Sequence, residues 1–518
     1  MLSRVKSAAV AGIDAYIVDV EVDISFGLPM FNMVGMPETA VRESRERVKS
    51  AVKNSGYKFP VDRIVVNLAP AAIKKEGTSL DLPVAMGILS ASGVVPLEKC
   101  SQFLMVGELS LDGRVKPVPG VLSAALAAKD NGFAGVIVPF ANRAEAAIVK
   151  DIKVIPARSL SEVVEFISGR AIIDPVTTDF LSLTGECSDR ETDFCEVMGQ
   201  SHAKRALEIA AAGGHNLCMT GPPGSGKTML AKRLSTILPP LTFDEALETT
   251  QIYSVVGLLG PGRPFMSKRP FRSPHHTISD AGLVGGGRVP EPGEVSLAHN
   301  GVLFMDEFPE FKRNVLEALR QPMEDGVVTI CRASSRVSYP ASFMLVAAMN
   351  PCPCGYHGDG IKPCTCSDGE IQRYRRRISG PLLDRIDIHV DVPRVPFKEL
   401  TGSTRPEGSA SVRERVERAR ENQVKRFQAA PIHCNAQMGA TQIRQFASLD
   451  KAAVALLARA VDTFGMSARG HGRVVKIART IADIEDEPLI LHRHIAEAIQ
   501  YRSIDRKDPL GSYNPGQN

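Results

Sequence analysis

The sequence predicts an α/β protein built from several domains, and two observations carry this prediction. Strand-like apolar segments alternate with helical patterns as far as residue 400, whereas residues 401–505 show mainly helical periodicity. Between one such strand and the helix after it, residues 221–228 fit the phosphate-binding pattern G-x-x-x-x-G-K-[ST] at every specified position. A chain of 518 residues is long enough for roughly three domains of about 150 residues each.

Changes in periodicity and composition place the expected boundaries. Asp, Thr, Ser and Gly dominate the stretch after the first α/β pattern, as they do in linkers. The expected division is an α/β domain at 1–168, a linker at 169–195, an αβα P-loop core at 196–400, a helical lid at 401–505 and a flexible tail at 506–518.

Bulk composition narrows the classes of protein. Hydrophobic residues make up 44% of the chain, and the net charge of +4 is too small to indicate a nucleic-acid partner by itself. Trp is absent and aromatic residues are only 5%, which argues against an aromatic-cage binder. The N-terminus has no signal-peptide pattern, and no apolar run reaches about 18 residues. We therefore expect a cytoplasmic protein with no membrane partner and with reduced cysteines.

The first domain is expected to have mixed topology. Ala15–Ile24 alternates apolar and polar residues at period two, as a half-buried strand does. Pro83 falls in the first turn of the helical segment Leu80–Ala91, where proline is tolerated. Further expected elements are strands at Arg63–Leu68, Phe103–Val106 and Gly135–Pro139 and a helix at Thr39–Lys53.

The P-loop lies in the expected context. Asn216–Thr220 reads as a short buried strand, and Met229–Leu238 reads as a helix whose N-terminus points at bound phosphates. The glycines let backbone N–H groups approach phosphate oxygens. Lys227 would reach the β- and γ-phosphates of ATP, and Thr228 would place its hydroxyl on Mg²⁺. The residues expected to bind ATP are Gly221, Pro222, Pro223, Gly224, Ser225, Gly226, Lys227 and Thr228.

Two later strands end in polar residues that would complete a hydrolysis site. The apolar strand from Gly301 runs into Asp306 and Glu307, which is the Walker B pattern. Alone, this acidic pair could cap a helix, but its place after a P-loop favours Asp306 as a water-mediated Mg²⁺ ligand. Glu307 would orient and polarise the attacking water. The strand from Ser342 ends in Asn350, whose amide would help to hold that water.

Two segments within the predicted core carry positive charge that could contact nucleic acid. Residues 251–299 are rich in Gly and Pro, and residues 327–339 read as a hairpin with arginines flanking its tip. Positive side chains spaced to match phosphates would attract a nucleic-acid backbone. The alternative is that these charges belong to solvent-exposed loops that bind no nucleic acid. For the basic run Arg373–Arg377, an intersubunit or nucleotide-proximal role is as well supported as DNA contact. The candidate DNA contacts are Lys268, Arg269, Arg272, Arg288, Arg332 and Arg336.

A cysteine-rich insertion at residues 352–366 follows Asn350 directly. Two close pairs of cysteines suit tetrahedral zinc, although the C-x-C spacing is tighter than the usual C-x₂-C. We expect a structural zinc ion, with redox-active or unliganded thiols as the alternative. The zinc ligands would be Cys352, Cys354, Cys364 and Cys366, whereas Cys187 and Cys195 in the linker read as free thiols.

Helices are expected on either side of these sites. Ser201 is a plausible N-cap for the helix that leads to the P-loop strand. In the C-terminal domain, helices are expected at Ser411–Phe427, Ala440–Phe464, from Met466 onward, and at His492–Tyr501.

At residues 77–81 and 107–118 the first domain resembles the proteolytic domain of Lon proteases, which implies a Lon-like, ribosomal-S5-like α/β fold. In that family a serine is activated by a lysine. Ser79 falls at the serine position and Leu122 at the lysine position, while Lys116 lies at the wrong place in the motif. Because a serine without its base is a poor nucleophile, we expect the fold without proteolysis.

Residues 196–400 resemble an AAA+ ATPase of the magnesium-chelatase-like group. Three segments, Arg272–Gly287, Gly293–Phe304 and Asn350–Gly355, look like the ComM (YifB) family, and the resemblance spans nearly the whole chain. It implies a homohexameric, ATP-driven motor on single-stranded and branched DNA. The family is associated with helicase and branch-migration activity in homologous recombination during bacterial natural transformation.

The same resemblance implies roles for three arginines. Arg385 would reach into the neighbouring subunit's site, where its planar fork suits transition-state phosphate charge, although alone it would more often form a surface ion pair. Arg469 falls where the lid arginine touches the γ-phosphate, with Arg473 as the alternative. Two other functions stay open: a chelatase-like ATPase that remodels a protein partner, which the basic hairpin disfavours, and an ATP-dependent protease, which Leu122 disfavours.

Overall fold

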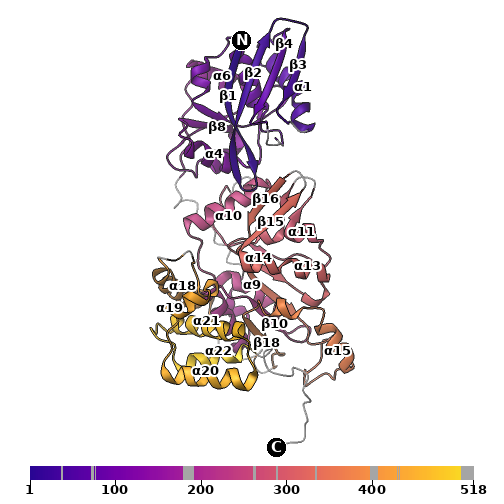
Figure 1. Cartoon of the computed structure of the whole chain (residues 1–518), viewed down its shortest axis with the longest axis vertical. Helices are drawn as coiled ribbons and strands as arrows, with labels where there is room; N and C mark the ends of the chain where they lie inside the picture. The colour runs from indigo at the N-terminus through magenta and orange to yellow at the C-terminus, as the bar shows by residue number, and fades with distance from the viewer. Residues whose placement is uncertain are drawn as a thin grey trace, which may run out of the picture.

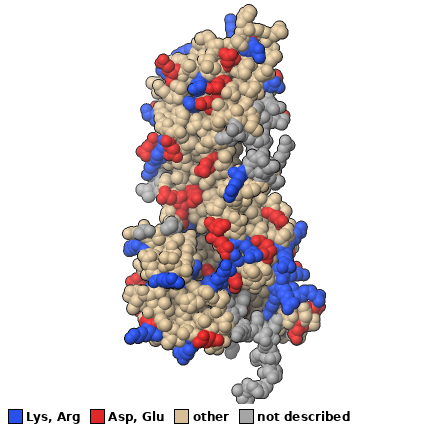
Figure 2. All heavy atoms as spheres, in the orientation of Figure 1, with Lys and Arg blue, Asp and Glu red and all other residues tan. Residues whose placement is uncertain are grey.

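The N-terminal tier lies at one end of the long axis of the molecule, the middle tier follows it, and the C-terminal helices lie beside the lower part of the middle tier (Figure 1). The computed structural model describes residues 1–36, 39–71, 75, 77–178, 192–260, 264–287, 290–332, 335–396, 399, 406–428, 430 and 432–502. The α/β class expected from the sequence is confirmed by two sheets with helices around them and by a C-terminal group of helices. In this view, acidic and basic side chains are mixed over the N-terminal tier (Figure 2). None of the described helices is long and apolar enough to cross a membrane.

The N-terminal tier is a seven-stranded mixed sheet in the order β3-β4-β2-β1-β5-β8-β9. Its first two strands pair antiparallel over their whole length, from Leu2 opposite Asp23 to Ala11 opposite Asp14. Helix α2 is buried along its entire length. The elements are β1 (Leu2–Ala11), β2 (Asp14–Ser25), β3 (Met30–Val34), α1 (Thr39–Asn54), β4 (Arg63–Ala69), α2 (Asp81–Ala91), α3 (Leu97–Cys100), β5 (Phe103–Met105), β6 (Glu108–Leu109), β7 (Val115–Lys116), α4 (Val121–Asp130), β8 (Gly135–Pro139), η1 (Phe140–Asn142), α5 (Arg143–Ala146), β9 (Lys153–Ala157) and α6 (Leu160–Ser168).

The middle tier contains a five-stranded parallel sheet in the order β11-β14-β17-β10-β18. The two strands β14 and β17 are buried at every position, as expected for a parallel sheet covered on both faces. The elements are η2 (Phe194–Glu196), α8 (Ser201–Gly213), β10 (Leu217–Thr220), α9 (Lys227–Ile237), α10 (Phe243–Val255), β11 (Phe271–Arg272), α11 (Asp280–Val284), β12 (Gly285–Gly286), β13 (Glu291–Pro292), α12 (Glu294–Leu297), β14 (Val302–Met305), η3 (Phe308–Glu310), α13 (Arg313–Ala318), α14 (Arg320–Asp325), β15 (Val327–Arg332), β16 (Ser335–Pro340), β17 (Met344–Met349), α15 (Asp368–Arg375), α16 (Gly380–Leu383) and β18 (Ile388–Asp391).

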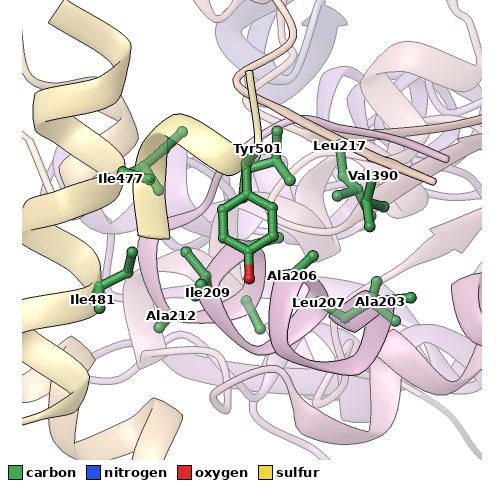
Figure 3. Packing of buried hydrophobic residues seen from close by; sticks show 14 of the residues in the cluster. Ala203, Ala206, Leu207, Ile209, Ala212, Leu217, Val390, Ile477, Ile481 and Tyr501 are labelled. Atoms are coloured by element: carbon green, nitrogen blue, oxygen red, sulfur yellow. The ribbon is translucent and has the colours of Figure 1, made fainter. Parts of the chain in front are cut away.

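The C-terminal helices share one apolar core with the middle tier. In Figure 3, Ile477 and Ile481 of these helices and Tyr501, just after the last of them, lie against the apolar face of α8. This face consists of alanines with Leu207 and Ile209, and Leu217 and Val390 of the sheet belong to the same cluster. The lid therefore packs on the same helix that leads into the P-loop strand. The elements are α18 (Ser409–Arg426), η4 (Asn435–Gln437), α19 (Ala440–Phe446), α20 (Lys451–Phe464), α21 (Ala468–Ile484) and α22 (His492–Gln500).

Three expectations about local structure need correction. The N-cap of α8 is Gln200 in a left-handed conformation, so Ser201 is the first helical residue and caps nothing. The helix expected at Ala440–Phe464 is interrupted, because the Asp450 carboxylate accepts a hydrogen bond from Ala453 N and starts α20 afresh. The segment 251–299 is not purely a projecting loop, since it supplies β11, the edge strand of the parallel sheet.

Among the described residues, the N-terminal and middle tiers contact each other through α4 and through the turn between β1 and β2. Helix α4 packs against α10, and Gly120 N donates a 3.0 Å hydrogen bond to Ser254 O. The turn between β1 and β2 reaches the β15–β16 hairpin, where a Cβ placed on Gly12 would lie 3.0 Å from Ser338 O. The hairpin expected at 327–339 is confirmed as an element, and Val337 and Ser338 in the middle of β16 lie against the N-terminal tier.

Candidate functional site

The P-loop joins β10 to α9 at the carboxyl edge of the parallel sheet. Gly224 and Gly226 have left-handed backbone conformations, with φ of 76° and 92°. A Cβ placed on either would meet no atom within 4 Å, so both positions face open space in which a phosphate could lie. The buried Ser225 Oγ makes no hydrogen bond within the described part of the chain. These features fit a polyphosphate ligand.

Lys227 is held in the centre of this loop. Its Nζ donates to Gly221 O at 2.7 Å, to Pro222 O at 2.9 Å and to Asn350 Oδ1 at 3.3 Å. The residue is only 8% exposed, and burial lowers the pKa of its ammonium group. Since Asn350 follows β17, neighbouring parallel strands bring these two predicted site residues together.

The residues expected to bind Mg²⁺ also meet. Thr228 Oγ1 donates a 2.7 Å hydrogen bond to Asp306 Oδ2 across the gap between α9 and the end of β14. Hydroxyl and carboxylate oxygens are ligands that Mg²⁺ takes alongside waters and phosphate oxygens. The donor set therefore fits the ion expected from the sequence.

Glu307 lies beside this pair but faces a different partner. Its backbone is left-handed, with φ of 52°, and its N–H donates to Asp306 Oδ1 at 2.9 Å. The Glu307 Oε2 lies 3.1 Å from Nδ1 of His276. The imidazole follows β11, the edge strand beside β14, and its ring also contacts Phe311 edge-on at 6.4 Å between centroids.

The three predicted arginines lie in different environments. Arg385 is 11% exposed and forms an ion pair with Glu324 of its own chain, while its Nη1 donates to Pro381 O at 2.6 Å. Arg473 Nε lies 3.3 Å from Asp387 Oδ1, in contact with the core. Arg469, near the start of α21, is exposed. Of the two lid candidates, only Arg469 is therefore oriented to solvent in the described structure.

Two candidate DNA contacts are engaged inside the chain. Arg269 donates to Pro239 O and Asn300 O, both at 2.7 Å, and lies 2.8 Å from a Glu245 oxygen. Arg272 forms a two-pronged pair with Glu294, at 2.6 and 2.7 Å. Both therefore form ion pairs within the chain in this structure, and contact with nucleic acid stays a prediction for them. Lys268 and Arg336 are exposed, whereas Arg288 and the side chain of Arg332 lie outside the described residues.

A basic surface lies on the side of the core that carries α13 and α15. Figure 2 shows Lys and Arg gathered there. A cleft of about 540 Å³ on this side is lined by Pro309, Glu310 and Phe311 together with the arginines of the basic surface. We define the basic surface as Arg313, Arg373, Arg376 and Arg377.

The four cysteines of the insertion converge on one point. All four Sγ atoms lie within 4.8 Å of one another, and Cys352 Sγ is 3.3 Å from that of Cys354 and 3.7 Å from that of Cys364. A tetrahedron with Zn–S bonds of about 2.3 Å has edges of about 3.8 Å, so the cluster fits the ion. Backbone N–H groups of Thr365 and Tyr356 lower the pKa of Cys354 to about 5, whereas burial raises that of Cys364 to about 12.

The Lon-like turn lacks an assembled catalytic group. Ser79 is half-buried, and Leu122 is 0% exposed within an apolar cluster. Lys116 is exposed on β7, and no hydrogen bond joins it to Ser79 among the described residues. Next to the turn, Asp81 pairs with Arg47 at 2.8 Å, and burial raises the pKa of Asp81 to about 6 although the Arg47 guanidinium opposes this.

The parallel sheet with its P-loop and Walker B carboxylates defines a P-loop ATPase of the AAA+ magnesium-chelatase type. Residues 193–400 match the family model "Magnesium chelatase, subunit ChlI", residues 20–142 match "Subunit ChlI of Mg-chelatase", and residues 406–502 match "Magnesium chelatase, subunit ChlI C-terminal". Family membership supports ATP and Mg²⁺ as ligands and ATP hydrolysis as the activity.

Relatives that match along the full length of the chain show to which family within this class it belongs. The chain is 45% identical over 510 residues to Competence protein ComM of Haemophilus influenzae and 44% identical over 507 residues to Uncharacterized protein YifB of Escherichia coli, covering 98% of each chain in both cases. It belongs to the ComM/YifB family. Lon protease 2 of Bacillus subtilis is 32% identical over 143 residues, which are 27% of this chain and 24% of that protein. The N-terminal region is therefore Lon-like.

Two partners of the site residues were not predicted from the sequence. His276 reaches Glu307 because β11 ends beside β14, and the sequence offered a signal in the His-His pair just after that strand. Glu324 reaches Arg385 across 61 positions of the chain, and no local pattern marks it.

Proposed function

We propose that this protein is an Mg²⁺-dependent ATPase that assembles as a homohexameric ring and moves on single-stranded and branched DNA. In this proposal it is a helicase-type branch-migration factor of homologous recombination during natural transformation. The main support for ATP hydrolysis is that Lys227 contacts Asn350 while the adjacent Thr228 contacts Asp306. The DNA half is supported by the full-length similarity to a competence protein.

The residues of the site divide the work of hydrolysis. Lys227 would move its ammonium from the loop carbonyls to the β- and γ-phosphates. Mg²⁺, held through Thr228 and Asp306, would neutralise phosphate charge. Glu307 would leave His276 to polarise water, and Asn350 would orient the same water.

We propose the ring because Arg385, the expected arginine finger, would act in the site of a neighbouring subunit. Arg385 would exchange its ion pair with Glu324 for the γ-phosphate held by the neighbouring subunit. Arg469, which is exposed on α21, would approach the nucleotide when the lid closes. We propose the domain division of the chain in the same terms: Lon-like region, linker, ATPase core and lid.

DNA contact is assigned to exposed positive charge. Lys268 and Arg336 remain candidates, and the basic surface adds four arginines. All four are exposed, and Arg377 pairs with Glu310 at 2.6 Å. Arginine side chains at this density attract phosphate backbones without reading sequence. We also propose that the four-cysteine cluster holds one structural Zn²⁺.

The test measures ATP hydrolysis of the purified protein without DNA, with single-stranded DNA and with a four-way junction, together with strand displacement on a fluorescent fork. We expect stimulation by both DNAs and ATP-dependent displacement. Absence of stimulation and of DNA binding at low salt would overturn the DNA half while leaving the ATPase half intact. Hydrolysis stimulated by a protein fraction and not by DNA would favour a remodelling ATPase.

A further inference from the structure

The four-cysteine loop folds back onto the P-loop. Gly355, one residue after Cys354, has a left-handed φ of 85°. A Cβ placed on Gly355 would lie 2.6 Å from Pro223 Cδ, 2.8 Å from Pro223 Cγ and 3.9 Å from Asn350 Cγ. The backbone of the loop therefore rests directly on a P-loop residue and beside the amide that accepts from Lys227.

The cluster itself fixes this turn. Gly355 N donates a 3.0 Å hydrogen bond to Cys352 O, and His357 N lies 3.3 Å from Cys352 Sγ. Cys354 N in turn approaches Cys366 Sγ at 3.4 Å. Backbone N–H groups pointing at sulfur are the outer-shell support that orients metal-bound thiolates. The position of Gly355 thus depends on the two cysteine pairs being held together.

A second attachment ties the loop to the other side of the P-loop. Asp359 pairs with Arg394 at 3.1 Å, and the Arg394 guanidinium lies 5.5 Å from the Tyr356 ring centroid. Arg394 is two residues beyond Val392, whose carbonyl oxygen is so close to Gly221 that a Cβ there would lie 2.1 Å away. The loop therefore bridges the first and third residues of the P-loop through neighbouring chain segments.

We propose that the four-cysteine loop is a working part of the ATP site, and that its bound metal sets the affinity for ATP by positioning Pro223 and Asn350. This inference rests on the proposed zinc and nucleotide sites. The cation is of the borderline-soft, four-thiolate class, which Zn²⁺ represents. Without the metal, the two cysteine pairs separate and the turn at Gly355 loses its fixed position. The P-loop is then less preorganised, so that part of the ATP binding energy is used to order it and the affinity for ATP falls.

The sharpest test compares two alanine substitutions in one loop. Gly355 and Gly358 both have left-handed backbone, with φ of 85° and 78°, so alanine strains both alike. Only the Cβ at Gly355 meets Pro223, whereas nothing lies within 4 Å at Gly358. We expect both variants to retain about one zinc per chain by mass spectrometry. Gly355→Ala should raise the Kd for a fluorescent ATP analogue about tenfold, and Gly358→Ala should leave it within about twofold.

Removal of the metal provides the second measurement. Cys366→Ser should lower zinc content toward zero and weaken ATP-analogue binding, whereas Cys331→Ser, an exposed cysteine on β15, should change neither. Zinc returned to chelator-treated wild type should restore the original Kd. Metal-free protein that is folded by circular dichroism and binds the analogue normally would overturn the coupling, as would equal Kd values for the two glycine variants. Wild type that binds the analogue but contains no zinc would overturn both the metal site and the coupling, and wild type that binds no analogue would overturn the proposed ATPase.

Discussion

Two turns in this chain carry residues suited to catalysis, and they differ in what surrounds them. The P-loop lysine Lys227 meets Asn350, and the neighbouring Thr228 meets Asp306, so groups from three strands converge. Ser79 sits in an equally short turn of the Lon-like region, but the position that would carry its base is Leu122, buried among apolar side chains. Reactivity in this molecule follows from partners brought in by distant elements and not from the turn itself.

The largest expected effect separates these two sites directly. Lys227→Ala should lower ATP hydrolysis by about 10³-fold, because the phosphates lose their central positive charge. Ser79→Ala should leave hydrolysis within about twofold, and neither variant nor wild type should cleave fluorescent casein. Phosphate release measures the first quantity and peptide fluorescence the second. Casein cleavage that disappears in Ser79→Ala would reverse the comparison.

A smaller effect is expected from restoring the missing base. Leu122→Lys should destabilise the protein by about 3 kcal/mol, because the ammonium group would be desolvated in an apolar cluster. Leu122→Met keeps the volume and should cost less than about 1.5 kcal/mol. Urea unfolding followed by circular dichroism measures both. A Leu122→Lys protein that stays stable and cleaves casein would show that only this one group separates the turn from an active protease.

The presence or absence of partners from distant elements also distinguishes the internally paired Arg269 from the exposed Arg336. Arg269→Ala should lower stability by about 2 kcal/mol, since Glu245 and the carbonyls of Pro239, Pro240 and Asn300 lose their donor, with no change in DNA affinity. Arg336→Ala should leave stability unchanged and reduce the slope of log Kd for single-stranded DNA against log salt by about 0.7. Fluorescence anisotropy across a salt series gives the slope. The opposite pattern would mean that Arg269 leaves its internal partners when DNA binds.

The smallest effect concerns a contact that belongs to no motif. His276→Ala should release the Glu307 carboxylate and raise DNA-free hydrolysis by up to about fivefold, because an exposed ion pair is worth about 1 kcal/mol or less. His275→Ala is the comparison variant, since His275 makes no ion pair with Glu307 among the described contacts; it contacts Thr277, and its ring lies 4.2 Å from that of His276. Phosphate release under identical conditions compares the two. A fall in hydrolysis for His276→Ala would instead make the imidazole a positioning group for the active carboxylate.

Much of the nucleotide site could be predicted because it rests on short-range rules. The P-loop glycines, the Walker B carboxylates and Asn350 each stand at the end of an apolar strand, and parallel strands bring their ends to one edge. The ion pairs of Arg269 and Arg272 could not be predicted, because Glu245 and Glu294 lie more than twenty positions away and nothing local marks them. Local sequence patterns thus predicted the residues of the nucleotide site but not the acidic residues that pair with Arg269 and Arg272.

Strand β1 shows a second limit of sequence patterns. Its inward residues include Ser3 and Ser7, whose hydroxyls donate to Gly87 O at 2.7 Å and Met105 O at 2.8 Å. Buried serines with backbone partners erase the apolar alternation that marks a strand. No strand was therefore predicted there, although β1 lies at the centre of the seven-stranded sheet.

The packing of α4 on α10 has a consequence for how this chain can be divided. Val121 and Leu122 of the N-terminal tier belong to the same apolar cluster as Ala246 and Phe265 of the ATPase core. Cutting the chain in the linker would thus expose two complementary apolar surfaces, one on each fragment. Each fragment expressed alone would aggregate through its exposed apolar surface. Two fragments expressed together would bind each other through the same interface as in the intact chain. The two tiers therefore share an apolar interface, although each contains its own sheet.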